Sequence, residues 1–174
     1  MIGCNRLFYY PSSREYRTPQ DLAVPVEEVR FKSEDGTGLH GWLLQPGEGR
    51  EAAGTVVHFH GNAQNLSAHV GFVAWLAEHG YNVFVFDYRG YGKSDGSPER
   101  AGVIADSRAA LAYIRGRKDI DSSRLLVLGQ SLGGACALAA LGEGSREGVR
   151  AIAIDSSFLS YRQVANSVLG GTVL

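Results

Sequence analysis

The feature of this sequence that most constrains its fold is an alternation of short apolar runs with amphipathic segments. The apolar runs, rich in β-branched and aromatic residues, cover residues 55–60, 81–86, 125–128 and 151–154. Runs without polar alternation are typical of strands buried on both faces. Between them, segments 70–79 and 103–114 space their apolar residues three and four apart, as amphipathic helices do. This succession predicts an α/β fold with a doubly wound, mostly parallel sheet.

The N-terminal part of the chain follows a different pattern. Residues 1–25 contain several prolines and read as an irregular lead-in. Residues 26–32 and 39–44 are strand-like, and Asp35 and Gly36 between them suit a hairpin turn, so we expect an antiparallel opening to the sheet. No repeat or low-complexity tract divides the rest, and we expect residues 26–174 to form one domain.

Composition argues against several function classes. The formal net charge of −1 gives no field that would attract nucleic acid, and no stretch approaches the roughly 20 apolar residues of a membrane span. Cys4 and Cys136 form no metal-binding or disulfide pattern, and we expect neither a metal nor a cofactor. A soluble, by default cytoplasmic, protein is the expectation. As an alternative, residues 1–4 resemble the end of a lipoprotein cleavage site, which would make Cys4 the anchor of an exported protein.

The strongest chemical signal is the run Gly129-Gln130-Ser131-Leu132-Gly133 directly after the apolar run 125–128. A small-residue segment that favours a helix follows it. Strand, G-x-S-x-G and helix is the context of a nucleophile elbow, in which the serine is exposed on a strained turn and the glycines prevent clashes. A serine that merely caps the helix is the alternative, but it would need no paired glycines. We predict that Ser131 is a nucleophile.

Two backbone N–H groups are candidates for stabilising an oxyanion. The N–H of Leu132 lies at the start of the helix after Ser131, where the helix dipole favours negative charge. The N–H of Asn62 lies in the turn that follows residues 55–60. In the same turn His60 suits a loop-bracing hydrogen bond better than the role of general base. Each of these assignments assumes that the two turns meet at one edge of the sheet.

A glycine-punctuated loop, residues 87–96, follows the run 81–86. Its spacing does not match a phosphate-binding loop, because no G-x-x-x-x-G-K-[ST] or G-x-G-x-x-G pattern opens a helix there. Asp87 and Arg89 are better placed to brace the loop through charge-assisted hydrogen bonds than to perform chemistry.

The segments HGNA (60–63), DYRGYGKSDG (87–96) and GQSLGG (129–134) together resemble the α/β-hydrolase superfamily, over residues 26 to 157. The resemblance is closest to serine hydrolases of the esterase, thioesterase and peptidase-like branch. It implies the α/β-hydrolase fold and a Ser/acid/His triad. On that basis Ser131 attacks the carbonyl of a small-molecule carboxylic ester or acyl thioester, and an acyl-enzyme forms and is hydrolysed.

The sequence departs from that family after Ser131. The family's acid and histidine follow the serine, yet the last histidine here is His79. We expect the chain to be a fragment whose triad acid, histidine and C-terminal strands lie beyond Leu174; a natural short form is the alternative. Asp155 is a weaker candidate for the acid, since the turn that it opens looks more like the start of a substrate-covering cap.

Three further expectations follow from that departure. By itself the chain should be nearly inactive, because Ser131 lacks a downstream base. The strand 151–154 should be an uncovered, apolar sheet edge through which copies of the chain self-associate. The alternative function is that of a non-catalytic binding or scaffold domain that keeps the fold without a complete triad.

Overall fold

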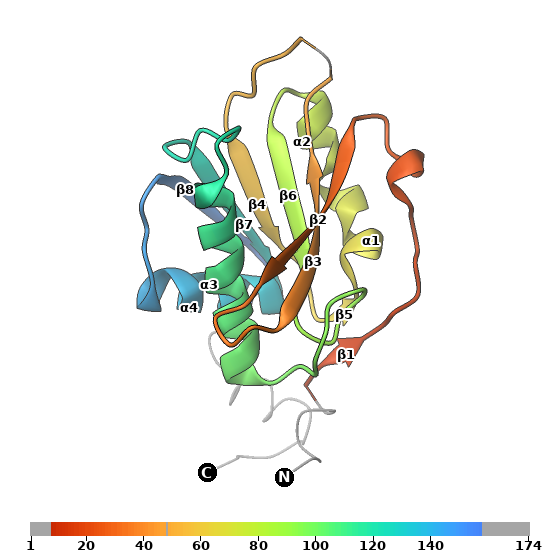
Figure 1. Ribbon diagram of the computed structural model, residues 1–174, viewed down its shortest axis with the longest axis vertical. Coiled ribbons are helices and arrows are strands. Elements are labelled where there is room, and N and C mark those ends of the chain that lie inside the picture. The colour runs from red at the N-terminus through yellow and green to blue at the C-terminus, as the bar shows by residue number, and fades with distance from the viewer. Residues whose placement is uncertain (1–7, 48, 158–174) are drawn as a thin grey trace.

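The computed structural model describes residues 8–47 and 49–157, and within them a twisted sheet lies between helices (Figure 1). The six strands of this sheet, in chain order, are β2 (Val26–Lys32), β3 (Gly38–Leu44), β4 (Thr55–Phe59), β6 (Asn82–Asp87), β7 (Leu125–Gln130) and β8 (Val149–Asp155). The longer helices are α3 (Arg100–Gly116) and α4 (Leu132–Glu143). Shorter elements are β1 (Tyr10–Pro11), η2 (Pro19–Asp21), β5 (Ala63–Gln64), α1 (Leu66–His69), η3 (Val70–Phe72) and α2 (Ala74–Glu78).

The sheet has the spatial order β2-β3-β6-β4-β7-β8. β2 pairs with β3, and β3 with β6, in antiparallel register, whereas β6, β4, β7 and β8 run parallel. Every residue of β4 and β6 is buried, as expected for strands covered on both faces. The predicted α/β fold with an antiparallel N-terminal hairpin and a mostly parallel sheet is confirmed.

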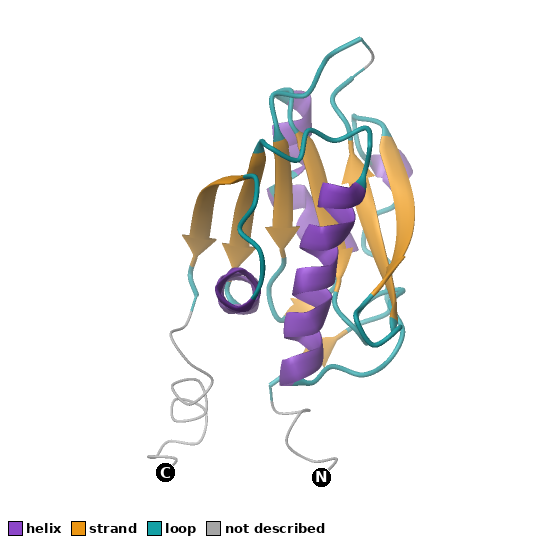
Figure 2. Cartoon of the chain, turned by 60° about the vertical axis from the view of Figure 1, so that its left-hand side comes forward, coloured by secondary structure: helices purple, strands orange, loops and turns teal. Residues whose placement is uncertain are grey.

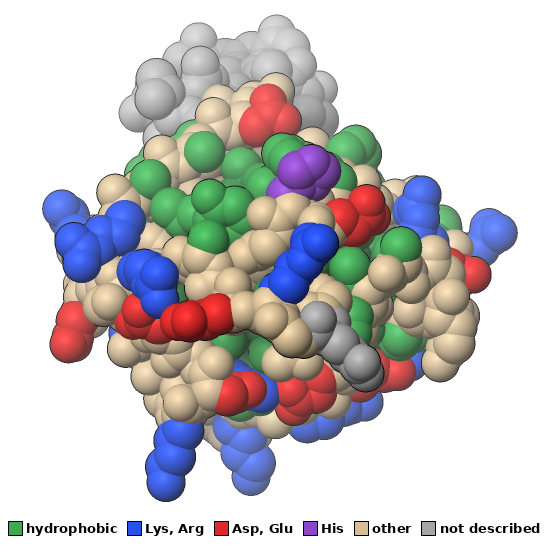
Figure 3. All heavy atoms as spheres, turned by 90° about the horizontal axis from the view of Figure 1, so that it is seen from above, with side chains coloured by type: hydrophobic (Ala, Val, Ile, Leu, Met, Phe, Trp, Pro, Cys, Tyr) green, Lys and Arg blue, Asp and Glu red, His purple; other side chains and the backbone are tan. Residues whose placement is uncertain are grey.

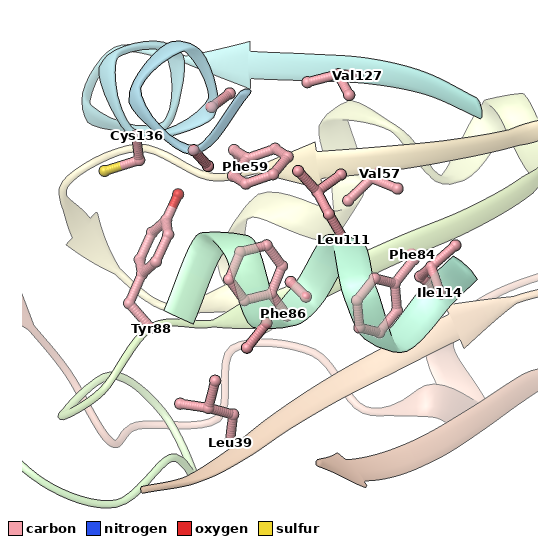
Figure 4. Close-up of a cluster of buried hydrophobic side chains, with 14 of the residues drawn as sticks. Leu39, Val57, Phe59, Phe84, Phe86, Tyr88, Leu111, Ile114, Val127 and Cys136 are labelled. Carbon is pink, nitrogen blue, oxygen red and sulfur yellow. The ribbon is translucent and has the colours of Figure 1, made fainter. Parts of the chain in front are cut away.

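Helices cover the two faces of the sheet unequally. α3 and α4 lie on one face, and α1 and α2 lie on the other (Figure 2). The larger core lies under α3 and α4, where Phe59, Phe86 and Leu111 interdigitate between the sheet and α3 (Figure 4). The smaller core includes Trp42 and Val73, beneath α1 and α2. Burial of these apolar side chains is the main favourable contribution to the fold.

The helix predicted over residues 70–79 is wrong as a continuous element. Residues 70–79 are divided between η3 and α2, and Val73 between them leaves helical geometry with φ −127° and ψ −13°. Arg17 of the lead-in donates to the carbonyl of Ala68, in the preceding helix α1, at 3.1 Å. The apolar spacing still matches the structure, because Val70, Val73 and Ala77 are buried.

β8 forms one edge of the sheet in the described part of the chain. It pairs with β7, and Ile152 and Ile154 are 43% and 38% exposed. The uncovered apolar strand expected from the sequence is therefore present, while the self-association inferred from it stays a prediction.

The surface and the termini bear on the remaining expectations. Basic and acidic side chains are mixed over the face seen in Figure 3, without a large patch of one sign. No described helix is long and apolar enough to cross a membrane. Cys4 lies outside the described residues, and its role as a lipid anchor stays a prediction.

Candidate functional site

Three loops converge where the parallel strands β4, β6 and β7 end. β4 lies between β6 and β7, and Phe59 at its end pairs in register with Gly129 of β7. The segment 60–63, here called the β4 loop, therefore emerges beside the turn that carries Ser131. The carboxyl edge of a parallel sheet is the usual position of a ligand-binding site in open α/β folds.

Ser131 occupies a strained turn between β7 and α4. Its backbone has φ 52° and ψ −116°, a conformation that a non-glycine residue rarely adopts. The side chain makes no capping hydrogen bond to the helix, so the helix-cap alternative is not supported. The Ser131 N–H donates to the carbonyl of Asp155 at 2.8 Å, and the Ser157 hydroxyl donates to the Ser131 carbonyl at 2.9 Å. These contacts hold the strained backbone from both sides.

The two glycines of the turn are required by close packing. A Cβ on Gly129 would lie 2.6 Å from the Cα of Gly134, and a Cβ on Gly133 would overlap the carbonyl group of Phe59. α4 can thus begin directly against the ends of β4 and β7 only where these side chains are absent. The spacing predicted from the sequence has this steric cause.

The β4 loop passes close to Ser131. An added Cβ on Gly61 would lie 3.8 Å from the Cβ of Ser131. The side chain of Asn62 is turned away: its Oδ1 accepts from the Tyr91 hydroxyl at 2.8 Å, and its Nδ2 donates to the carbonyl of Phe8. Within the described residues the backbone N–H groups of Asn62 and Leu132 donate to no other group. Both candidate oxyanion donors are therefore uncommitted.

Asp87 joins the β4 loop to the hairpin. Its Oδ1 accepts from the N–H of Leu66 at 2.7 Å and lies 3.4 Å from Nε2 of His60, and its Oδ2 lies 3.7 Å from Nδ1 of His40. Complete burial would raise the pKa of this carboxyl, but the contacts with His40, His60 and Leu66 outweigh it and keep the pKa below its ordinary value. Asp87 is thus an ionised brace inside the protein.

Arg89 joins three elements in the same way. Its guanidinium bonds Asp106 of α3 at 2.8 Å and Asp35 of the hairpin turn at 2.8 Å, and it also reaches the hydroxyl of Ser33. The side chain is largely buried, and its partners satisfy the planar donor fork. The contacts of Asp87 and Arg89 are those expected of braces for the loop 87–96.

All five histidines of the sequence are described, and none hydrogen-bonds the side chain of Ser131. His60 is buried, and its Nδ1 donates to the carbonyl of Gly61 at 2.7 Å, the bracing contact predicted for it. The proximity of the Asp87 carboxylate to His60 was not predicted from the sequence. His58 is buried in β4, where burial, with His60 and His69 nearby, lowers its pKa to about 3.

Asp155 ends β8 close to Ser131, but its carboxylate is exposed. Oδ1 accepts from the hydroxyl of Ser156 at 2.7 Å. No histidine contacts it in the described residues, so its role as a triad acid stays a prediction. Nor do the described residues contain a group of three histidine, cysteine or acidic side chains that could hold a metal ion.

One residue of the site escaped the sequence reasoning. His69, at the end of α1, lies between the β4 loop and the turn of Ser131: its Nε2 is 2.9 Å from the carbonyl of Ala63, and its Nδ1 is 3.3 Å from the carboxamide of Gln130. The only available signal was its position shortly after the β4 loop and directly before the helix predicted over residues 70–79.

Relatives of known sequence cover most of the chain. YfhR of Escherichia coli K12 is 45% identical over 167 residues, which are 95% of this chain and 58% of YfhR. WAV2 of Arabidopsis thaliana, an α/β-hydrolase domain-containing protein, is 37% identical over 154 residues, 87% of this chain and 49% of WAV2. The chain thus spans about half to three fifths of the length of these relatives.

A solved structure agrees in fold. An esterase of Pyrococcus furiosus superposes with a TM-score of 0.75 at 26% identity, over 94% of this chain and 61% of the esterase. The family model described as the alpha/beta hydrolase fold matches residues 54–171, which include the β4 loop, the loop 87–96 and the turn of Ser131. The chain belongs to the α/β-hydrolase family.

Proposed function

We propose that this chain carries the nucleophile and oxyanion hole of a serine hydrolase that cleaves a carboxylic ester or acyl thioester through an acyl-enzyme on Ser131. The observation that carries the proposal is the backbone of Ser131, held at φ 52° and ψ −116° at the start of α4. Strain at a non-glycine residue is kept where function needs it. The hydrolase family and the esterase neighbour support the reaction class.

In the proposed reaction, Oγ of Ser131 attacks the carbonyl carbon of the substrate while a general base takes its proton. The bond to the leaving alcohol or thiol then breaks, the base returns the proton to that group, and the acyl group stays on Ser131. Water, deprotonated by the same base, attacks the acyl-enzyme. The carboxylic acid leaves and Ser131 regains its proton.

The backbone N–H groups of Asn62 and Leu132 are the proposed donors to the oxyanion. Both are uncommitted within the described residues, and they belong to segments that flank Ser131. The N-terminal end of α4 adds its dipole on the side of Leu132. Donors of this kind contribute about 3 kcal/mol each to transition-state stabilisation.

The base and acid of the triad are proposed to follow Leu174 in a longer form of the protein. None of the five histidines bonds Ser131, and the matched relatives are longer than this chain. Asp155 is the weaker candidate for the acid. Without a base, the 174-residue chain should retain only the oxyanion hole and weak binding, which in triad-deleted enzymes leave about 10³ to 10⁴-fold over water.

One observation favours a second function, a non-catalytic binding or scaffold domain. It is again the absence of a hydrogen bond between Ser131 and any of the five histidines. A longer form without an acid and a histidine after Ser131 would support this alternative, since the strained serine would then have no base.

Hydrolysis by the longer form, extended to the length of YfhR, separates the two functions. With p-nitrophenyl acetate and an acyl thioester as substrates, wild type should turn over and Ser131→Ala should lose at least about 10⁴-fold in kcat with its far-UV circular dichroism unchanged. Ser123→Ala, on the loop before β7, is the matched control and should keep full activity. Turnover that persists in Ser131→Ala would overturn the proposal.

A further inference from the structure

His69 contacts both segments that carry the two proposed oxyanion donors. It is half-buried at the end of α1, and its Cε1 would lie 3.3 Å from a Cβ placed on Gly61. The same Cβ position is 3.8 Å from the Cβ of Ser131. The imidazole therefore packs over the part of the β4 loop that faces the serine.

The hydrogen bonds of His69 define its tautomer. Nε2 lies 2.9 Å from the carbonyl oxygen of Ala63, which can only accept, so Nε2 carries a proton. Nδ1 lies 3.3 Å from Oε1 of the Gln130 carboxamide. In a neutral ring with the proton on Nε2, Nδ1 is an acceptor, so this tautomer requires the carboxamide to be turned by 180° with its NH₂ group toward Nδ1; the O and N ends of an amide are assigned from the hydrogen-bond network.

The surroundings of His69 favour the neutral ring. Burial lowers its pKa, and the ring of His60, stacked at 5.2 Å with an interplanar angle of 24°, lowers it further. The contacts with Ala63 and Gln130 act in the opposite direction without reversing the shift. His69 is thus able to donate through Nε2 and accept through Nδ1 at the same time.

Each of these two contacts ends close to one oxyanion donor. Ala63 follows Asn62 in the chain, and Gln130 precedes Ser131 and Leu132. The donors lie on segments about 70 residues apart, and catalytic groups must be held within roughly 0.5 Å of the productive geometry. A side chain bonded to both segments fixes the distance between them.

We propose that His69, as the neutral Nε2–H tautomer, is a positioning residue that clamps the β4 loop to the turn of Ser131 and so sets the width of the oxyanion hole. The proposal rests on the function proposed above. A clamp of this kind affects the transition state more than substrate binding, because the oxyanion forms only as the reaction proceeds.

Kinetics of the longer form test the clamp. His69→Leu removes both contacts and should lower kcat by about 10 to 100-fold, with KM changed less than about 3-fold. His69→Gln can keep the donor to Ala63, and His69→Asn can keep the contact with Gln130, so each should lose less than His69→Leu. Gln130→Leu removes the contact with Gln130 and keeps the one with Ala63. Its kcat should therefore be closer to that of His69→Gln than to that of His69→Asn. His79→Leu, at the exposed end of α2, is the matched control and should be unchanged.

Nitrogen-15 NMR of the 174-residue chain tests the tautomer without reference to activity. At neutral pH His69 should show a protonated Nε2 and an unprotonated Nδ1, and Gln130→Leu should shift the Nδ1 resonance alone. A charged ring, or the opposite tautomer, would overturn the clamp. So would a folded, active protein in which His69→Leu leaves kcat unchanged. If wild type instead hydrolyses no ester or thioester, the proposed function fails, and the positioning role fails with it whatever the tautomer.

Discussion

β6 and β8 have similar sequences and opposite environments. Both are short apolar strands that end in aspartate, yet all six residues of β6 are buried whereas β8 is exposed along nearly its whole length. β6 lies between β3 and β4, and β8 pairs with β7 at the edge of the described sheet. An apolar run therefore predicts a strand, while its burial depends on neighbours that the run itself does not specify.

The same contrast holds within one register pair. Val127 of β7 and Ile152 of β8 are partners across the parallel ladder, but Val127 is 1% exposed and Ile152 is 43% exposed. Apolar burial stabilises a fold in proportion to the area removed from water. The interior strands and the turn that they carry should accordingly respond to substitution far more strongly than β8.

The largest expected effect is at Gly133, where the interior admits no side chain. Gly133→Val should abolish soluble, folded protein, because the added atoms overlap the backbone of Phe59 at the end of β4. Gly142→Val on the same helix is the matched control, since nothing lies within 4 Å of a Cβ there. Soluble yield and circular dichroism provide the measurement. A folded Gly133→Val protein with full esterase activity in the longer form would show that the described turn geometry is wrong.

Truncation of Val127 and Ile152 to alanine should lower the free energy of unfolding by different amounts. Val127→Ala should lower the free energy of unfolding by about 2 kcal/mol, because it leaves a cavity in the core. Ile152→Ala removes atoms that remain largely in contact with water, so its cost should stay below about 1 kcal/mol. Urea unfolding of both variants gives the two values. Equal costs would mean that β8 is covered in solution.

The buried His58 of the interior strand β4 should make the stability of the fold depend on pH. The pKa of His58 is about 3 in the folded chain and about 6.5 when the chain is unfolded, so the unfolded state binds the proton first as pH falls. Stability should therefore fall between pH 6.5 and pH 3, with His58 contributing about 1.4 kcal/mol per pH unit. His58→Leu should flatten the dependence by that amount, and the exposed His79→Leu should not. Urea unfolding at several pH values gives the free energy of unfolding as a function of pH. The same pH dependence in the His58→Leu and His79→Leu proteins would contradict the prediction.

Substitutions in the edge strand β8 should have the smallest effect on stability and the clearest effect on self-association. Ile152→Lys and Ile154→Lys should change the free energy of unfolding by less than about 1 kcal/mol, yet together they should shift the 174-residue chain toward monomer, since charge on an edge strand disfavours pairing with another chain. Size-exclusion chromatography with light scattering measures the change. A wild-type chain that is monomeric at all concentrations would remove the basis for this association.

Much of the fold could be predicted because its signals are local. Apolar runs, the Asp35-Gly36 turn and the glycines around Ser131 each determine their own segment, and strand, hairpin and turn were found where expected. The break at Val73 was not predicted, because the apolar spacing of residues 70–79 is the same for a continuous helix and for η3 followed by α2.

The candidate site divides in the same way. Ser131 and the N–H of Leu132 follow from one short motif, whereas the contacts of His69 join segments that are distant in sequence and show no shared pattern. The proximity of Asp87 to His60 and His40 likewise arises from the order of the strands in the sheet. Sequence patterns indicate the proposed nucleophile, whereas the proposed positioning groups emerge only from the tertiary structure.

The central claim, that Ser131 is the nucleophile, is tested most directly by covalent labelling. The longer form, incubated with a fluorophosphonate and digested, should carry the phosphonyl group on Ser131 and on no other serine, because Ser131 occupies a strained turn at the start of α4 with the two proposed oxyanion donors on the adjoining segments. Mass spectrometry of the labelled peptides gives the position. Labelling of Ser131 that is lost in Ser131→Ala is the predicted result; modification of a different residue, or of none in a protein that hydrolyses esters, would contradict it.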